Sequence, residues 1–348
     1  MNDDTTVKAA VLSAGAWSQH SHLPTLLADP AVEIIAVTSP DLRIREQISS
    51  RWPQLTVTDD SSSALAASPD LVVVSSPPAT HEALVIAALE SGAHVLVEKP
   101  FATEPSSAHR MAETAASVDR GLLVGFSWSS CPAIQTGQSW ASEVGRVDHV
   151  EGRLVVNTRG LMTGSRDGGW GGSVATTTST YTDPALSGGG VGMVSMSHLL
   201  SIVFWICDER PVEVACVTYP VGRGLDLHMS LLARTASGAT MAISTLSGQP
   251  GMARPEWLLG LYGNGGDLRI DTANERTWFC SAAGDVREHH EKGAGLVDQH
   301  LPTRAALAVA RGAPVPTALS ARLGVEVVAA TDAAYRAAAS GRWERVAT

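Results

Sequence analysis

The first 125 residues alternate short apolar runs with segments of helical character, and this alternation constrains the fold more than any other feature. The apolar runs are residues 7–12, 32–38, 71–74 and 94–97. Strands that alternate with helices along a chain are joined by crossover connections, which produce a parallel sheet with helices on its faces. We therefore expect residues 1–125 to form an α/β domain built on a parallel sheet.

The pattern changes after about residue 125. Short runs of alternating apolar and polar residues, separated by turns such as Ala236-Ser237-Gly238, are typical of an antiparallel sheet. These runs are residues 146–157, 211–219, 225–235, 239–247 and 257–262, and alanine-rich segments at 304–311 and 320–340 predict helices. We expect residues 126–348 to form an α+β domain with a large, mainly antiparallel sheet. Helices should cover one face, and the other should stay partly apolar, as in subunits that associate.

The turn after the first apolar run lies where a strand passes into a helix. A dinucleotide-binding turn at this place carries three glycines. The first permits the tight turn, the second lets the pyrophosphate approach the backbone, and the third lets the helix pack closely on the strand. Here Gly15 holds the middle place, Ser13 the first and Ser18 the third. We predict a Rossmann-type cofactor site formed by Ser13, Gly15, Ala16 and Trp17, in which the Cβ of Ser13 crowds the turn.

The end of the second apolar run bears on the choice of dinucleotide. NAD enzymes place an acidic side chain there, on the ribose 2′-hydroxyl. This chain has Ser39, followed by Asp41 and Arg43. A hydroxyl with a nearby guanidinium suits a 2′-phosphate better than a carboxylate does. We therefore predict NADP as the preferred cofactor, bound in part by Ser39 and Arg43, with NAD as the alternative.

The tripeptide Glu98-Lys99-Pro100 places an amine at the end of the fourth apolar run, and ligands bind at the carboxyl ends of strands in open α/β sheets. The proline removes a ladder donor and so ends the strand. A lysine so placed can serve as an acid, a base or an anion clamp, although a lysine after a strand is more often a solvated loop residue.

These motifs, together with Ser76-Pro77-Pro78, His81, Val124-Gly125-Phe126 and Gly188-Gly189-Gly190 followed by His198, resemble one family over essentially the whole chain. It is the glucose–fructose oxidoreductase, inositol dehydrogenase and MocA-type family. The resemblance implies an NAD(P)-dependent dehydrogenase or reductase that acts on a hydroxyl or carbonyl of a sugar, cyclitol or related polyol. It also implies a homodimer or homotetramer, a second domain for substrate binding and oligomerisation, and cofactor contacts from Ser76, Pro77, His81, Glu98 and Lys99.

The resemblance places the catalytic groups at Lys99 and His198. Two acidic residues commonly flank the histidine in the family, and this chain has Val194 and Ser201 at those positions. A hydride transfer needs one proton donor or acceptor at the substrate oxygen. We predict His198 as the acid/base and Lys99 as the group that polarises and orients the oxygen; the reverse assignment is the alternative. The replaced residues also leave open a non-catalytic dinucleotide or sugar sensor, of the galactose-regulon repressor type.

Residues 159–187 are rich in Gly, Thr and Ser, and long irregular segments in compact domains are usually functional or disordered. Within this segment, the side chains of Trp170, Tyr181 and Asp183 are candidates for substrate binding. Trp170 could lie on a sugar face, and Tyr181 and Asp183 could bond to hydroxyls. Packing within the loop is the alternative for each.

Composition narrows the remaining possibilities. The formal net charge is −10, and no lysine and arginine stripe is present, which argues against nucleic acid and membrane surfaces as partners. No apolar stretch reaches the roughly 18 residues of a membrane helix, and the acidic start is unlike a signal peptide, so we expect a cytoplasmic protein. The four cysteines are dispersed, and we predict reduced thiols and no metal site. His289-His290 is predicted to lie in a charged loop from Asp285 to Lys292.

Overall fold

The computed structural model describes residues 6–164, 179–220, 224–248, 252 and 254–347. Its described residues form two compact units. The first contains residues 6–126 and 299–325, and the second contains the described residues of 127–164, 179–298 and 326–347.

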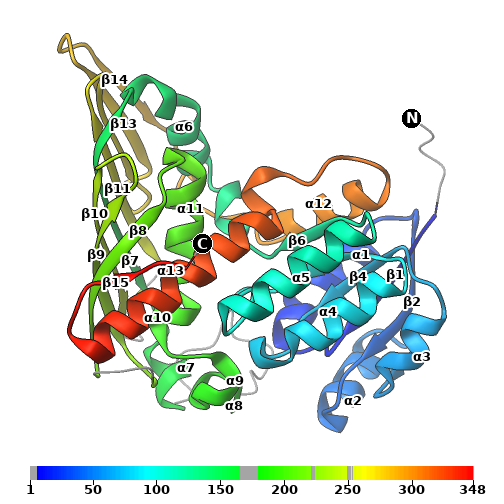
Figure 1. Cartoon of the computed structure of the whole chain (residues 1–348). Coiled ribbons are helices and arrows are strands. Elements are labelled where there is room, and N and C mark those ends of the chain that lie inside the picture. Colours follow the sequence, from blue (N-terminus) through cyan, green and yellow to red (C-terminus); the bar gives the residue numbers. More distant parts are fainter. Residues whose placement is uncertain (1–5, 165–178, 221–223, 249–251, 253, 348) are drawn as a thin grey trace. The chain divides into compact units, whose positions relative to one another are not determined.

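The first unit is built on a six-stranded parallel sheet in the order β3-β2-β1-β4-β5-β6 (Figure 1). This is the strand order of doubly wound dinucleotide-binding sheets, and the predicted parallel sheet is confirmed. The strands are β1 (Val7–Leu12), β2 (Val32–Thr38), β3 (Val57–Thr58), β4 (Leu71–Val74), β5 (His94–Val97) and β6 (Leu122–Val124). The helical elements between them are η1 (Ser18–His22), α1 (Leu23–Leu27), α2 (Leu42–Arg51), α3 (Ser61–Ala66), η2 (Pro78–Thr80), α4 (His81–Glu90) and α5 (Pro105–Ser117).

The first unit also takes in a late segment of the chain, which corrects the predicted boundary between 1–125 and 126–348. Residues 299–325 belong to this unit and carry α12 (Leu301–Ala310) and η5 (Thr317–Leu319). Ala306, Leu307 and Val309 of α12 are buried where the helix packs against β4, β5 and β6. A contiguous boundary was predicted because the sequence pattern does not show which sheet a late helix covers.

The second unit is built on a nine-stranded sheet in the order β14-β13-β12-β11-β7-β10-β9-β8-β15. All neighbouring strands are antiparallel except β7 and β10, so the predicted mainly antiparallel sheet is confirmed. The strands are β7 (Val147–Val156), β8 (Pro211–Tyr219), β9 (His228–Thr235), β10 (Thr240–Ser247), β11 (Glu256–Gly263), β12 (Gly266–Asp271), β13 (Arg276–Ser281), β14 (Val286–His290) and β15 (Glu344–Arg345).

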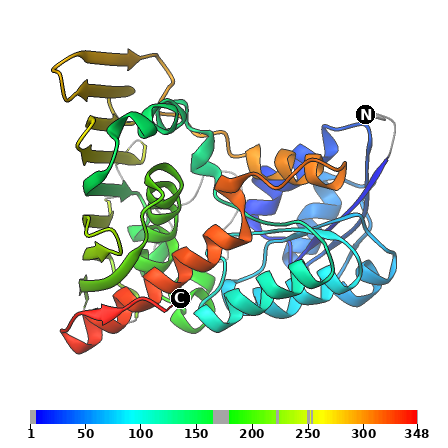
Figure 2. The same ribbon diagram turned by 45° about the horizontal axis from the view of Figure 1, so that its top comes forward.

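Helices gather on one side of this sheet (Figures 1 and 2). The apolar helix α11 (Met196–Cys207) packs on β7 and β10, and α6 (Pro132–Trp140) packs on β12 and β13. The remaining helical elements of this unit are η3 (Ser127–Ser130), η4 (Ala141–Val144), α7 (Arg159–Thr163), α8 (Ser179–Thr182), α9 (Pro184–Ser187) and α10 (Val191–Val194). The last helix, α13 (Ala321–Ser340), contributes its first residues to the first unit and the rest to the second.

Strand β14 shows that the predicted loop at residues 285–292 was wrong. Residues 286–290 form β14, the edge strand of the sheet, and pair with β13. An edge strand bonds on one side only and is often charged. The alternation of apolar and polar residues that predicts a strand depends on a buried face. It is absent here because Arg287, Glu288 and His289 are polar.

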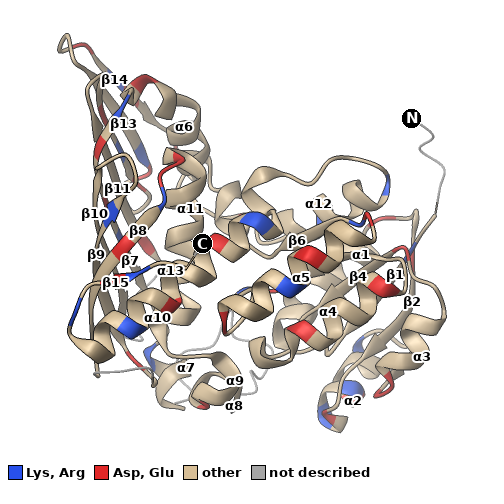
Figure 3. Ribbon diagram, in the orientation of Figure 1, with Lys and Arg blue, Asp and Glu red and all other residues tan. Residues whose placement is uncertain are grey.

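Lysine and arginine are interspersed with aspartate and glutamate over the described elements (Figure 3). All four cysteines are free thiols, and the described residues contain no group of three or more metal-ligating side chains. No single described helix is long and apolar enough to cross a membrane. The bent pair Pro184–Val194 and Met196–Cys207 meets that test by length and composition, with a bend of 49°.

Candidate active site and cofactor loop

The turn after β1 has the backbone of a glycine turn but begins with a serine. Ser13 has φ of 53°, in the left-handed region that glycine adopts without strain. Its N–H donates to Thr38 Oγ1 at 3.1 Å, and the next N–H, of Ala14, donates to the Thr38 carbonyl at 2.6 Å. The end of β2 therefore holds the turn in place, which stabilises a conformation that is unfavourable for Ser13 itself.

Gly15 occupies the middle of this turn. A Cβ at Gly15 would meet no atom within 4 Å, so the protein's own packing does not require a glycine there. The open space fits the close approach of a pyrophosphate, which is the reason dinucleotide-binding turns carry a glycine at this place. Ala16 and Trp17 follow, both partly exposed.

The predicted ribose contacts lie at the end of β2. Ser39 is buried, and its carbonyl accepts from the Arg45 guanidinium at 2.7 Å. Arg43 turns to Asp41, with 3.1 Å between Nη2 and Oδ2, and this contact lowers the pKa of the Asp41 carboxyl. Asp41 also caps α2 by accepting from the Arg43 N–H. The cation nearest to the Ser39 backbone is therefore Arg45, a residue that sequence reasoning did not single out.

His81 connects the loops that follow β4 and β5. It is 1% exposed, and its two ring nitrogens lie 2.9 Å from the Ser76 carbonyl and 3.1 Å from the Phe101 carbonyl. Burial lowers the pKa of this imidazole, and the neutral ring can donate to only one of the two carbonyls at a time. Pro77, between Ser76 and η2, accepts through its carbonyl from the N–H and hydroxyl of Thr80. His81 thus holds the two loops together.

The Glu98-Lys99 segment follows β5 directly. The Glu98 carboxylate is buried; its Oε1 accepts from the Trp17 indole at 2.9 Å, and its Oε2 accepts from the Lys99 N–H at 3.1 Å. Desolvation lowers the pKa of the Lys99 ammonium, and the Glu98 charge opposes that shift. The structure therefore brings Trp17 of the cofactor turn and Glu98-Lys99 together, as two parts of one site in the first unit.

His198 lies in the first turn of α11, in the second unit, and is 7% exposed. Its backbone carbonyl accepts from the Ser201 hydroxyl at 2.8 Å, so Ser201 bonds within its own helix. Val194, at the other position where the family carries an acid, is buried at the end of α10.

A buried carboxylate that sequence reasoning missed holds the Gly188–Gly192 segment. Asp226 Oδ1 accepts from the Gly190 N–H at 3.0 Å and from the Tyr335 hydroxyl at 2.6 Å, and its Oδ2 accepts from the Gly192 N–H at 2.8 Å. A Cβ on Gly190 would lie 2.1 Å from the Asp226 carbonyl oxygen. The glycines are therefore needed for this contact. The only sequence signal was an acidic residue between Leu225 and Leu227.

Two of the three residues of segment 159–187 that were predicted to bind substrate lie in the described part of the chain, in different surroundings. Asp183 is exposed and caps α9 by accepting from the Ala185 N–H at 2.9 Å. Tyr181 is half-buried in α8. Trp170 lies outside the described residues.

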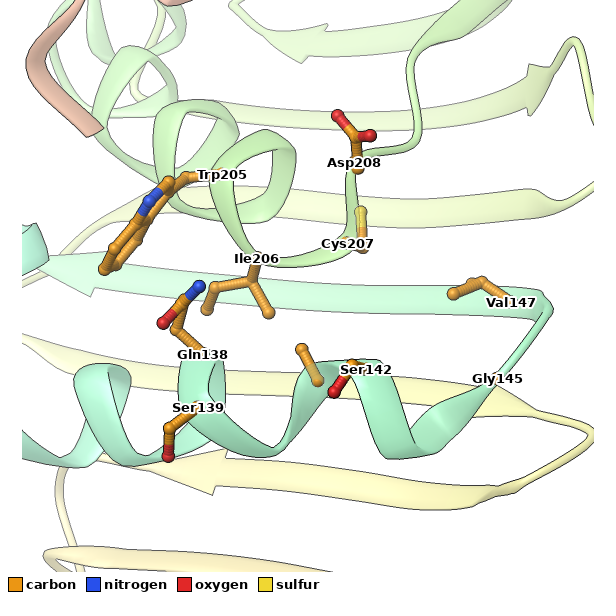
Figure 4. Close-up of a pocket in the computed structure, with 10 residues that line it drawn as sticks. Gln138, Ser139, Ser142, Gly145, Val147, Trp205, Ile206, Cys207 and Asp208 are labelled. Carbon is orange, nitrogen blue, oxygen red and sulfur yellow. The ribbon is translucent and has the colours of Figure 1, made fainter. Parts of the chain in front are cut away.

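A separate pocket of about 580 Å³ opens in the second unit beside the carboxyl end of α11 (Figure 4). Gln138, Ser142, Trp205 and Asp208 are among its lining residues. It lies at the opposite end of α11 from His198, roughly 13 Å along the helix axis. None of the predicted site residues lines it.

Two family models match this chain. The model of the GFO/IDH/MocA oxidoreductase family, described as an NAD-binding Rossmann fold, matches residues 7–126. The model of the GFO/IDH/MocA C-terminal domain matches residues 142–269.

Curated proteins and solved structures are similar over different extents. D-glucoside 3-dehydrogenase of Escherichia coli is 27% identical over 208 residues, which are 60% of this chain and 56% of that protein. Inositol 2-dehydrogenase 4 of Saccharopolyspora erythraea is 37% identical over 95 residues, 27% of this chain and 28% of that protein. The matches thus span about half or less of these relatives.

Among solved structures, an oxidoreductase domain protein from Kribbella flavida has a TM-score of 0.81 at 21% identity, covering 99% of this chain and 100% of that one. A levoglucosan dehydrogenase in complex with NADH has a TM-score of 0.79 at 16% identity, covering 98% of this chain and 99% of that one. At these identities the likeness shows the fold.

Proposed function

Because this chain belongs to the GFO/IDH/MocA oxidoreductase family, we propose that it is an NAD(P)-dependent dehydrogenase or reductase. Its substrate would be a sugar, cyclitol or related polyol, oxidised at a hydroxyl carbon or reduced at the matching carbonyl. The observation that carries this proposal is Lys99, an amine with a lowered pKa directly after a central strand of the dinucleotide-binding sheet.

The nicotinamide dinucleotide would be held by the turn from Ser13 to Trp17, with Ser76 and Pro77 at the end of the neighbouring β4, and would supply the hydride acceptor or donor. Lys99 then orients the substrate oxygen and stabilises negative charge on it. His198 gives or takes the proton at that oxygen, because an imidazole nitrogen can both donate and accept a proton. The two roles exchange in the alternative assignment. Tyr181 and Asp183 are proposed to contact substrate hydroxyls.

The test begins with cofactor binding. Titration with NADPH, NADH, NADP and NAD, followed by nicotinamide fluorescence and thermal shift, should show saturable binding. A screen of polyols and keto-sugars with the bound cofactor should then show turnover. Lys99→Ala and His198→Ala should both lose turnover, and His198→Ala should keep dinucleotide affinity. A folded protein that binds none of the four dinucleotides would contradict the proposal.

The replacement of the flanking acids by Val194 and Ser201 favours a second candidate, a dinucleotide-dependent sugar sensor without turnover. For a sensor, dinucleotide and sugar bind, and no substrate in the screen changes nicotinamide absorbance.

The proposed preference for NADP rests on Ser39, which lacks the carboxylate that would repel a 2′-phosphate, and on the cations Arg43 and Arg45 near the end of β2. Ser39→Asp should weaken NADPH binding at least tenfold relative to NADH, because the new carboxylate would meet the 2′-phosphate. Ser39→Ala is the matched control and should change the ratio of the two affinities by less. Equal ratios in wild type and Ser39→Asp would discard this assignment of the ribose site.

We further propose that the enzyme is a cytoplasmic homo-oligomer that associates through the open face of the nine-stranded sheet. Val217, Tyr219 and Leu232 are 69%, 66% and 55% exposed on neighbouring strands. Residues on that face alternate with the buried residues that contact the helices, so the apolar side chains there are available to a second copy.

A further inference from the structure

The side chain of Glu98 contacts groups from several elements of the first unit. Its Oε1 lies 2.9 Å from the Trp17 indole nitrogen and 3.2 Å from His22 Nε2. Its Oε2 accepts from the backbone N–H of Lys99 at 3.1 Å. From β6, Gly125 leaves room for the carboxylate, since a Cβ there would lie 2.7 Å from Oε1. The carboxylate is therefore enclosed by groups from η1, the β5 end and the β6 end.

The local backbone explains why Trp17 and His22 reach the same oxygen. Residues Ser18–His22 form a π-helical turn, and the Leu23 N–H donates to the Ser18 carbonyl, five residues back. In such a turn, the hydrogen bond joins residues five apart and brings them closer to one face of the helix than an α-helical turn does. An α-helical turn would separate them by roughly 140°. Single π-turns inserted into helices are frequent at functional sites. Here the turn brings two ring nitrogens within 3.2 Å of one carboxylate oxygen, and the Trp17 nitrogen donates to it.

The His22 ring is also held by a contact on the side away from Glu98. It is 1% exposed, and its Nδ1 lies 2.8 Å from the hydroxyl of Thr303 on α12. The Nε2 atom of the ring therefore faces the Glu98 carboxylate, and the Nδ1 atom faces Thr303. The late segment that joins the first unit thus orients the imidazole toward Glu98.

We propose that His22 is a positioning residue for Lys99 that acts through Glu98, so that the cofactor turn and the lysine loop are held as one preorganised unit. The inference rests on the proposed role of Lys99 in the reaction. His22 keeps the buried Glu98 ionised and its Oε2 turned to the Lys99 backbone. Without the His22 ring, the Glu98 carboxylate is no longer held in place, and its negative charge favours the ammonium form of Lys99 less.

The charged and titratable groups around Glu98 are few. Beside His22 and Lys99, the described structure places His81 of α4 within its electrostatic influence. His81 is held by the carbonyls of Ser76 and Phe101 in all the variants below.

The chain has only three lysines, Lys8, Lys99 and Lys292, which makes the test specific. Trace labelling of the cofactor-free protein with acetic anhydride across a pH series, read by mass spectrometry of the three lysine peptides, reports the free-amine fraction of Lys99. Lys8 and Lys292 serve as internal references. Because neither cofactor nor turnover enters the measurement, failure of the proposed enzymatic function would not disturb it.

At about pH 8, His22→Ala should raise Lys99 labelling about fivefold over wild type, since a carboxylate that is no longer held beside Lys99 stabilises its ammonium form less. Glu98→Gln should also raise Lys99 labelling. Adding His22→Ala to Glu98→Gln should not change the labelling rate further, because the carboxylate through which His22 acts is already absent. His22→Gln, which keeps a donor near Nε2, should restore the wild-type rate. His20→Ala removes the exposed neighbour on the same turn, which bonds to Gln299, and is the matched control.

Wild-type labelling of Lys99 in folded His22→Ala would overturn the proposal. So would an effect of His22→Ala that persists in the Glu98→Gln background, because His22 would then act by another route. If His22→Ala does not fold, Trp17→Phe removes the other donor to the same oxygen, and its labelling must rise in the same direction for the proposal to stand.

Discussion

Ser13 shows how hydrogen bonds from a neighbouring strand can hold a binding turn in a conformation that is unfavourable for its residue. Its φ of 53° is imposed by the two hydrogen bonds that Thr38 accepts, and a residue with a Cβ is strained there. The sequence predicted this point, since the first glycine of the dinucleotide turn is replaced. The sequence could not predict that His22 lies beside Glu98, because that contact depends on a π-helical turn, and no residue type in the segment indicates one.

Ser13→Gly should stabilise the protein by about 1 kcal/mol, since glycine adopts positive φ without the Cβ penalty. It should also tighten NADH binding about threefold or more, because the Cβ that crowds the turn is removed where the pyrophosphate approaches. Urea unfolding and NADH fluorescence titration measure the two effects.

Ser68→Gly is the matched control, because Ser68 has φ of 54° and lies exposed outside the site. It should give a similar gain in stability and leave NADH affinity unchanged. Equal changes in NADH affinity for the two variants would show that the Ser13 backbone has no special part in binding.

At the scale of elements, the strands and helices that the sequence predicted are those with a buried face. The predicted runs at 211–219 and 239–247 coincide closely with β8 and β10. The edge strand β14 was missed because most of its residues are exposed. Asp226 was missed for another reason: its partners Gly190 and Tyr335 are remote in sequence, and only the folded chain brings them together.

Tyr335→Phe should destabilise the second unit by about 2 kcal/mol near neutral pH, because it leaves the buried Asp226 carboxylate without one of its three donors. Burial raises the pKa of Asp226 above 3.8, whereas the tyrosine bond lowers it by favouring the ionised form. The deficit should therefore be full above the folded-state pKa of Asp226 in the variant, and it should disappear as the pH falls to the lower folded-state pKa of the wild type.

Urea unfolding at several pH values measures this deficit. Tyr219→Phe is the matched control, since it keeps the apolar ring of the proposed interface and removes only the hydroxyl of a residue that is 66% exposed in the single chain. It should stay within about 0.5 kcal/mol of wild type. A deficit for Tyr335→Phe that does not change with pH would mean that the hydroxyl stabilises the unit by packing rather than through the Asp226 charge.

At the scale of the whole molecule, sequence pattern and family resemblance identified two sheets of different kinds but not which sheet each late helix covers. The open face of the nine-stranded sheet was predicted to stay partly apolar, and Val217, Tyr219 and Leu232 are exposed there. Association through that face remains a prediction.

The double variant Val217→Asp, Leu232→Asp should convert the oligomer to monomers, because two buried, unpaired carboxylates per copy oppose association. Size-exclusion chromatography with light scattering measures the mass. Leu42→Asp is the matched control: Leu42 is 58% exposed at the start of α2 in the first unit and should leave the mass unchanged. A wild-type protein that is already monomeric would contradict the proposed interface.

The placement of α12 in the first unit has a consequence for how the protein is made. Strands β4, β5 and β6 leave the ribosome early, but the helix that covers them does not exist until residues 125–300 have been added. At ordinary translation speeds that interval is roughly ten to thirty-five seconds. During it, the nascent first unit exposes the apolar surface that Leu307 and Val309 later bury, and this surface is where a chaperone would bind the growing chain.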